Sequence, residues 1–273
     1  MGKKLFENDF STKAVGICLS GGGALGFAHI GVLQSLEEHG IYPLQVAGSS
    51  MGAVVGTLYA AGISPLKMLQ IIKEDKLYRI TKLMSIRLTS INSGLSTHDT
   101  LREIIRELIP HNSFDKLPKK MNVCVSNLNI ADWEIVNTGE NLDKWVAASA
   151  SIPGIYEAMQ MNKCFYVDGG LLNNFPAQAL EQSCQKIIGV DVIPHFETLQ
   201  LKKPTDTFSW SVRIMEHKNS LPGRKLCHFL IEPMAIKKYH GFSFDAYQKI
   251  YEEGYKSTNN YIEKNPEILN LKN

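Results

Sequence analysis

The stretch that decides the fold runs from residue 14 to residue 52 and reads AVGICLSGGGALGFAHIGVLQSLEEHGIYPLQVAGSSMG. Ala14 to Ser20 is a short apolar run that ends at three glycines, which predicts a buried strand, and from Gly26 to His39 the apolar residues recur at helical spacing. Leu44 to Ser49 predicts a second strand, with a sharp turn at Ser50. The predicted order is therefore strand, glycine loop, helix, strand and turn.

The same alternation continues along the rest of the chain. An alanine-rich helix is expected over Ala53 to Ala61, and Pro65 is expected to open another. Later strands are expected at Met121 to Ser126, Glu134 to Asn137, Cys164 to Val167, Lys186 to Val192 and Cys227 to Glu232, and later helices at Thr97 to Ile109, near Trp145, at Ala177 to Ser183 and around Gly254-Tyr255. Alternating strands and helices predict an α/β fold with three α/β/α layers and a largely parallel central sheet.

Length and composition indicate one ordinary globular domain. The chain has 273 residues, of which 44% are hydrophobic and 21% are charged. We expect a single domain over residues 1–273, with the core motifs in 15–192 and a C-terminal part, 193–273, that includes a terminal helix. The net charge of +2 creates no field that would hold a polyanion, so nucleic acid is not an expected partner. The oligomeric state is left open.

The cysteines and the N-terminal residues indicate the cellular compartment in which the protein is expected. The five cysteines are scattered and contain no C-x-x-C pair, so they favour neither a disulfide framework nor a zinc site. Residues 1–12 lack the apolar core of a secretory signal, and no segment reaches the roughly 18 apolar residues of a spanning helix. We expect a cytoplasmic protein with the option of peripheral contact at the inner membrane face.

Two segments fit the sheet poorly and are expected to form a mobile cover. Lys76 to Ser96 carries four basic residues and no acid among apolar ones, so it could lie on an anionic lipid surface. A cap helix with a solvated basic face is an equal alternative. The second segment, His195 to Arg224, contains Pro204, Pro222 and Gly223, which are turn and breaker signals.

The glycine loop is predicted to bind an anion. Gly21-Gly22-Gly23-Ala24-Leu25-Gly26 presents backbone N–H groups at a helix N-terminus, where the dipole favours negative charge. The anion could be the oxyanion of an acyl-transfer intermediate or a dinucleotide pyrophosphate, because the loop also matches G-x-G-x-x-G. The dinucleotide needs an acid after the next strand, where this chain has Gly48-Ser49-Ser50. A tight turn without a ligand is the third alternative.

Ser50 is the candidate nucleophile. Gly48 to Gly52 matches G-x-S-x-G between a strand and a helix, a geometry that exposes the serine on a strained turn. A simple turn is the alternative. The first two strands are expected to be adjacent and parallel, which would place the glycine loop and Ser50 at the same carboxyl edge of the sheet.

Asp168 is the candidate base. It follows an apolar strand and precedes Gly169-Gly170, so the backbone can approach it closely, and a carboxylate held in a dry pocket gains basicity. Taken alone, an Asp before Gly is also a common cap or turn residue. The eight histidines offer the other kind of base, but each one is more often a surface or core residue than a catalyst.

Four blocks of the sequence, in this order, resemble the patatin-like phospholipase family, in particular its short bacterial members. The blocks are Gly21 to Gly26 with Ala28 to Leu33, then Gly48 to Gly52, then Ala150-Ser151-Ile152-Pro153-Gly154, then Asp168-Gly169-Gly170 with Asn173 and Pro176. The resemblance covers Val15 to Val192, and the chain from His195 onward matches only loosely.

The resemblance implies a patatin-like fold and a serine acyl hydrolase that uses a Ser–Asp dyad without histidine. Ser50 would be the nucleophile and Asp168 its base. The oxyanion hole would comprise Gly21, Gly22, Gly23 and Ala24, with the N–H groups of the last three as donors, and the supporting residues would be Gly26, Gly48, Gly52, Gly169, Gly170, Asn173 and Pro176. The substrate would be a lipid or another acyl ester, with no metal and no organic cofactor. Leu25 stands where many members have a basic residue, which puts a phosphate-headgroup preference in doubt.

Two other functions remain open at this point. One is a Ser–His–Asp α/β-hydrolase esterase, although its nucleophile turn follows several strands and Ser50 follows only the second. The other is a catalytically silent lipid-binding or regulatory module on the same fold. Headgroup, acyl length and positional preference are not determined by the sequence.

Overall fold

The computed structural model of the protein describes residues 14–74, 97–193 and 204–272. The predicted lipid-facing segment, Lys76 to Ser96, lies outside the described residues, and so do residues 195–203 of the second predicted cover segment.

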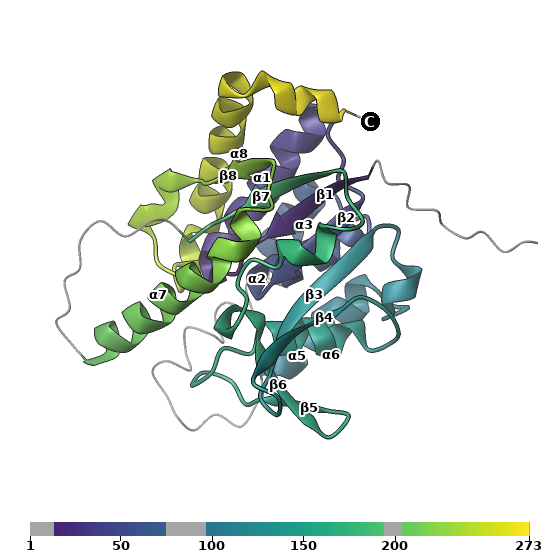
Figure 1. The fold of residues 1–273 in the computed structure, drawn as a ribbon, viewed down its shortest axis with the longest axis vertical. Coiled ribbons are helices and arrows are strands. Elements are labelled where there is room, and N and C mark those ends of the chain that lie inside the picture. The colour runs from purple at the N-terminus through teal and green to yellow at the C-terminus, as the bar shows by residue number, and fades with distance from the viewer. Residues whose placement is uncertain (1–13, 75–96, 194–203, 273) are drawn as a thin grey trace, which may run out of the picture.

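Within the described residues, a sheet of eight strands crosses the centre of the molecule (Figure 1). Its strands are β1 (Val15–Leu19), β2 (Gln45–Ser49), β3 (Lys120–Asn127), β4 (Asp132–Val136), β5 (Met159–Met161), β6 (Cys164–Asp168), β7 (Lys186–Val190) and β8 (Phe229–Ile231). The order is β5-β6-β3-β2-β1-β7-β8, with β4 also paired to β3. Strands β3, β2, β1, β7 and β8 are paired in parallel with their neighbours in this order. Strands β4 and β6 each pair antiparallel with β3, and β5 pairs antiparallel with β6. The predicted α/β fold with a largely parallel sheet is confirmed.

Seven α-helices are described around this sheet (Figure 1). They are α1 (Phe27–Glu38), α2 (Met51–Ala60), α3 (Pro65–Lys73), α5 (Thr97–Leu108), α6 (Leu142–Ser149), α7 (Pro204–Arg224) and α8 (Tyr247–Lys264). No described helix is by itself long and apolar enough to cross a membrane; α2 and α3 would be so only taken together, across a bend of 120°.

Both faces of the sheet are buried, as the three-layer prediction requires. Ile17, Leu19 and Val46 point into the larger core, which lies under α1, α2 and α6. Cys18 and Ala47, one residue along each strand, point into a smaller core on the other face, because side chains alternate along a strand. That second face is covered by two short 3-10 helices, Gly169–Leu171 and Ala177–Leu180, and by α7.

Three elements differ from the sequence-based expectations or add to them. The helix expected at Ala177 to Ser183 is only the 3-10 helix Ala177–Leu180. Residues 204–224, part of the segment expected to fit the sheet poorly and to form a cover, are the continuous helix α7: Pro204 is its first residue, where proline is well tolerated, and Pro222 lies inside its last turn. Strand β5 had no sequence signal, and it pairs with β6 through three residues.

Helices α1 and α8 cross in unusually close contact at two glycines. A Cβ atom added to Gly31 would lie 2.1 Å from the carbonyl oxygen of Tyr251, and one added to Gly254 would lie 2.2 Å from that of Ala28. Only glycine allows the two backbones to approach this far. The contact holds α8 against α1, the helix that follows the glycine loop.

We predict that Gly254→Ala lowers the free energy of unfolding by about 1–3 kcal/mol, because the added methyl group must push the helices apart. Denaturant unfolding of the purified variant measures the change. Lys256→Ala, at an exposed position on the same helix, is the control and should change stability by less than about 0.5 kcal/mol. An increase in stability for Gly254→Ala, as expected for an unconstrained helical glycine, would contradict the close packing.

Candidate active site

The glycine loop and Ser50 lie next to each other at the carboxyl edge of the sheet. Strands β1 and β2 are paired in parallel, with Leu19 opposite Gly48, so the turns that follow them are adjacent, as predicted. Asp168 reaches the same place from the other direction. Strand β6 runs antiparallel to β3, with Asp168 opposite Val125, and it ends beside the turn that holds Ser50.

The turn at Ser50 is strained, and its glycines are required by close backbone approach. Ser50 has φ 53° and ψ −126°, a positive φ that a residue with a side chain rarely adopts. A Cβ atom on Gly48 would lie 2.5 Å from the carbonyl oxygen of Gly52, and one on Gly52 would lie 2.2 Å from that of Leu19. The backbone N–H of Ser50 donates to the Ser149 hydroxyl at 3.0 Å. These contacts fix the serine at the start of α2.

The Ser50 hydroxyl donates a hydrogen bond to Asp168, with 2.6 Å between Oγ and Oδ2. Ser50 is only 7% exposed and Asp168 only 5%. The other carboxylate oxygen accepts the backbone N–H of Gly170 at 2.8 Å. Burial raises the pKa of Asp168 to about 7, and the two hydrogen bonds, from Ser50 and Gly170, oppose that rise. The carboxyl group is thus poised to take or give a proton near neutral pH.

The loop around Asp168 is held by backbone and serine contacts. The Asp168 N–H donates to the carbonyl oxygen of Ser151 at 3.0 Å, and Ser126 Oγ donates to the carbonyl oxygen of Asp168 at 2.9 Å. A Cβ atom on Gly169 would lie 2.4 Å from the Cys124 carbonyl oxygen, so the backbone passes β3 closely. Asn173 and Pro176 are the predicted supporting residues that follow Gly170. The backbone N–H of Asn173 donates to the Gly169 carbonyl oxygen at 2.8 Å, and Pro176 precedes the 3-10 helix Ala177–Leu180.

His29, the histidine nearest in sequence to the glycine loop, has another role. Its Nε2 lies 2.8 Å from the carbonyl oxygen of Ser20, and burial lowers its pKa to about 4, so the ring is neutral at pH 7. It packs within the core, as expected from the sequence.

Asn174 is a site residue that the sequence reasoning missed. Its side chain is fully buried beside the dyad: Oδ1 would lie 2.3 Å from a Cβ atom on Gly21 and 2.7 Å from one on Gly170. Neither Oδ1 nor Nδ2 has a hydrogen-bond partner among the described residues. The signal available was the pair Asn173-Asn174, of which only the first was singled out.

The glycine loop offers fewer free donors than predicted. The Gly21 N–H donates to the Asn174 carbonyl oxygen at 3.2 Å, and the Ala24 N–H donates to the Gly241 carbonyl oxygen at 2.8 Å. The expectation that Ala24 donates to an oxyanion is therefore wrong for this structure, because its hydrogen is already used. The N–H groups of Gly22 and Gly23 donate to no described residue. Gly26 packs against Met51, since a Cβ atom there would lie 2.3 Å from Met51 Cγ.

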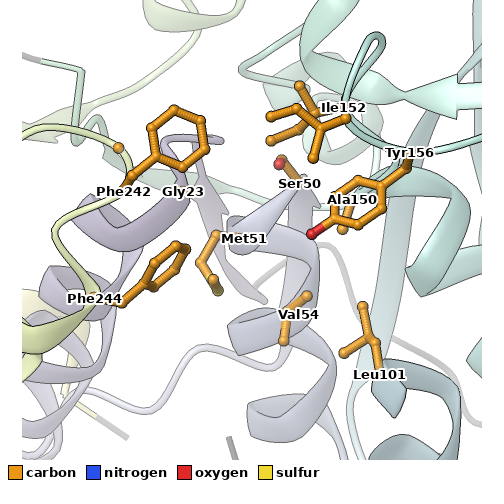
Figure 2. Close-up of a pocket in the computed structure, with 12 residues that line it drawn as sticks. Gly23, Ser50, Met51, Val54, Leu101, Ala150, Ile152, Tyr156, Phe242 and Phe244 are labelled. Carbon is orange, nitrogen blue, oxygen red and sulfur yellow. The ribbon is translucent and has the colours of Figure 1, made fainter. Parts of the chain in front are cut away.

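Ser50 opens onto an apolar cavity of about 30 Å³ (Figure 2). Figure 2 shows Ser50 above Val54, with Phe242 and Phe244 to one side and Ile152 and Tyr156 to the other. The lining residues are Gly23, Ser50, Met51, Val54, Leu101, Ala150, Ile152, Ile155, Tyr156, Gly241, Phe242 and Phe244. The wall from residues 241–244 had no functional signal in the sequence. The candidate nucleophile, the candidate base and backbone N–H groups thus meet at an apolar cavity, an arrangement suited to acyl transfer.

A second cavity of about 260 Å³ adjoins the first one at the glycine loop. It shares Gly23, Ile152, Ile155, Gly241 and Phe242 with the first, and adds Gly22, Ile193, Val212, Arg213, Glu216 and His240. Helix α7 therefore forms one of its walls.

Among residues 14–74, 97–193 and 204–272, no group of three or more His, Cys, Asp or Glu side chains is arranged to hold a metal ion.

The sequence matches a family model described as patatin-like phospholipase over residues 17–181, which is more than half of the chain. A lysophospholipase NTE1 of Candida albicans is 29% identical over 207 residues, which span 69% of this chain and 14% of that protein. An uncharacterized NTE family protein of Mycobacterium bovis is 31% identical over 173 residues, which span 61% of this chain and 45% of that protein. The chain thus spans less than half the length of either relative. Among solved structures, VipD of Legionella pneumophila has a TM-score of 0.49 and 14% identity, covering 93% of this chain and 67% of that one.

We predict that a fluorophosphonate probe reacts with Ser50 and that the reaction rate follows the ionisation of Asp168. The base is competent only when ionised, so the rate should rise about tenfold per pH unit below pH 7 and level off above it. Mass spectrometry of the labelled peptide locates the serine. Asp168→Asn should slow labelling by about 10²–10⁴-fold, whereas modification of a serine other than Ser50 would refute the assignment.

Proposed function

The chain belongs to the patatin-like phospholipase family, and we propose that it is a serine acyl hydrolase that cleaves carboxylic esters of lipids. The single observation that carries this proposal is the buried hydrogen bond of 2.6 Å between the Ser50 hydroxyl and the Asp168 carboxylate, at the edge of an apolar cavity.

In the first half-reaction, Asp168 takes the proton of Ser50 while Oγ forms a bond to the ester carbonyl carbon. The tetrahedral intermediate then expels the alcohol, which takes the proton back from Asp168, and an acyl-enzyme remains. The short distance between Oγ and Oδ2 means that no rearrangement is needed before the proton moves.

In the second half-reaction, Asp168 takes a proton from water, and the resulting hydroxide attacks the acyl-enzyme. The fatty acid leaves as Ser50 regains its proton from Asp168. During both halves, negative charge develops on the carbonyl oxygen, and the N–H groups of Gly22 and Gly23 are the proposed donors to it. Their place at the start of a helix supports this role, because the helix dipole favours negative charge there.

The lipid character of the substrate is supported by two observations. The cavity at Ser50 is lined almost wholly by apolar side chains, which suits an acyl chain. The Candida albicans relative is named as a lysophospholipase, which favours a lipid with a single acyl chain.

The proposal predicts that Ser50→Ala and Asp168→Asn each reduce fatty-acid release by about 10³-fold or more, because removal of either partner disables the proton transfer. Release is measured with p-nitrophenyl esters, a lysophospholipid, a phospholipid and a triacylglycerol. Ser49→Ala is the matched control: its hydroxyl is buried one residue away and has no partner among the described residues, so activity should be kept within about threefold.

The alternatives give different outcomes. A Ser–His–Asp triad would require one of the late histidines, so separate replacement of His195, His217, His228 and His240 by Gln should leave activity within about tenfold of wild type. A loss as large as that of Ser50→Ala at any one of them would overturn the dyad. Folded wild type that releases no fatty acid from any ester would favour the silent module.

A further inference from the structure

The second cavity has a polar wall that the proposed chemistry does not use. It lies directly beside Gly22 and Gly23, the proposed oxyanion donors, and at about 260 Å³ it is much larger than the apolar cavity at Ser50. Most of its lining is apolar, but Arg213 and Glu216 of α7 both face it. A cation and an acid therefore stand beside the reacting centre.

Arg213 and Glu216 are neighbours on one face of α7, because residues three apart on a helix have Cβ atoms about 5–6 Å apart. No ion pair or side-chain hydrogen bond joins either of them to another described residue. Both side chains are partly buried. Each charged group thus lies away from bulk water with room for a further polar partner.

The electrostatic surroundings of the two groups agree with this. Burial lowers the pKa of Arg213, and burial together with the negative charge of Asp168 raises the pKa of Glu216 to about 8, while the charges of Arg213 and Glu216 each partly oppose the shift of the other. A positively charged ligand group at Glu216 would compensate the charge that burial and Asp168 disfavour. A negatively charged group at Arg213 would do the same for the guanidinium.

The position of the two cavities separates the two halves of an ester substrate. With the acyl chain in the apolar cavity and the carbonyl oxygen at Gly22 and Gly23, the second cavity is the adjoining space for the alcohol that leaves. The glycine loop supplies no cation to that space, because Leu25 is its only large side chain and is fully buried. Among the described residues that line this space, the acid and the guanidinium both come from α7.

We propose that this second cavity binds the leaving group of the substrate and that this group is a zwitterionic phosphodiester, with its phosphate on Arg213 and its ammonium on Glu216. A guanidinium can donate two parallel hydrogen bonds to a phosphate, and a carboxylate accepts hydrogen bonds from an ammonium. In a phosphoethanolamine head a two-carbon link separates the two charges, which is comparable to the separation of about 5–6 Å between Cβ atoms three residues apart on a helix. The inference rests on the proposed acyl hydrolase function and names its substrate class.

The kinetic test compares three substrates that share one short acyl chain: lysophosphatidylethanolamine, lysophosphatidylglycerol and monoacylglycerol. Arg213→Gln should raise KM about tenfold for both phosphate-containing lipids and leave monoacylglycerol unchanged. Glu216→Gln should raise KM about tenfold for lysophosphatidylethanolamine alone. Lys218→Gln, at an exposed position on the same helix, is the control and should change none of the three. Equal effects on all three substrates, or no effect, would overturn the proposal.

A binding test separates this proposal from the proposed function. The Ser50→Ala protein is titrated with glycerophosphoethanolamine and with glycerol, followed by nuclear magnetic resonance, and the circular dichroism of each variant confirms that it is folded. Glycerophosphoethanolamine should bind at least tenfold more tightly than glycerol, and Arg213→Gln or Glu216→Gln should remove the difference. If no ester is hydrolysed but this binding is found, the function fails and the subsite stands. If esters are hydrolysed and the two ligands bind equally, the function stands and the subsite fails.

Discussion

The hydrogen bond between Ser50 and Asp168 is the constraint on which the rest of the structure depends. It joins residues 118 positions apart, and both are almost fully buried. To bring them within 2.6 Å, β1 and β2 must lie side by side in parallel while β6 returns antiparallel along β3. The glycines follow from that requirement, because Gly48, Gly52 and Gly169 each stand where a Cβ atom would collide with a backbone oxygen. The glycines of the G-x-S-x-G and Asp-Gly-Gly motifs are therefore required by close backbone packing as well as by the chemistry of the site.

The same burial that prepares Asp168 as a base reduces the stability of the fold. The pKa of Asp168 is raised from the ordinary aspartate value to about 7, so between these values the folded chain holds a proton that the unfolded chain has lost. Stability from this group is therefore fully present at low pH and is lost as the pH rises towards 7. Above pH 7 the carboxylate is charged and buried, with the Ser50 hydroxyl and the Gly170 N–H as its described hydrogen-bond donors. The condition under which the base can work is the condition under which the site is least stable.

The sequence predicted the features that depend on neighbouring residues. The features that it missed depend on contacts between residues far apart in the chain. The order of β1, the glycine loop, α1, β2 and Ser50 follows from apolar runs and glycines within 40 residues. The pairing of Ser50 with Asp168 was predicted from a motif and a family resemblance. By contrast, the Ala24 N–H is taken by the carbonyl oxygen of Gly241, and no pattern near residue 24 indicates this. The prolines of α7 are helix-breaker signals, but Pro204 occupies the first helical position, where its missing N–H costs no hydrogen bond, and Pro222 lies inside the helix only at its last turn.

The substrate of this chain cannot be inferred from family membership alone, because the matched region and the cavity walls come from different parts of the sequence. The family match ends at residue 181 and contains Ser50, Asp168 and the glycine loop, the proposed nucleophile, base and oxyanion hole. The walls that would distinguish one ester from another come partly from later residues: Arg213 and Glu216 on α7, and the loop with Gly241 and Phe242. A shared catalytic core determines which bond is cleaved, whereas the side chains around it determine which alcohol and acyl group fit. The proposed subsite therefore assigns headgroup preference to α7 and residues 240–244, which lie outside the matched family region.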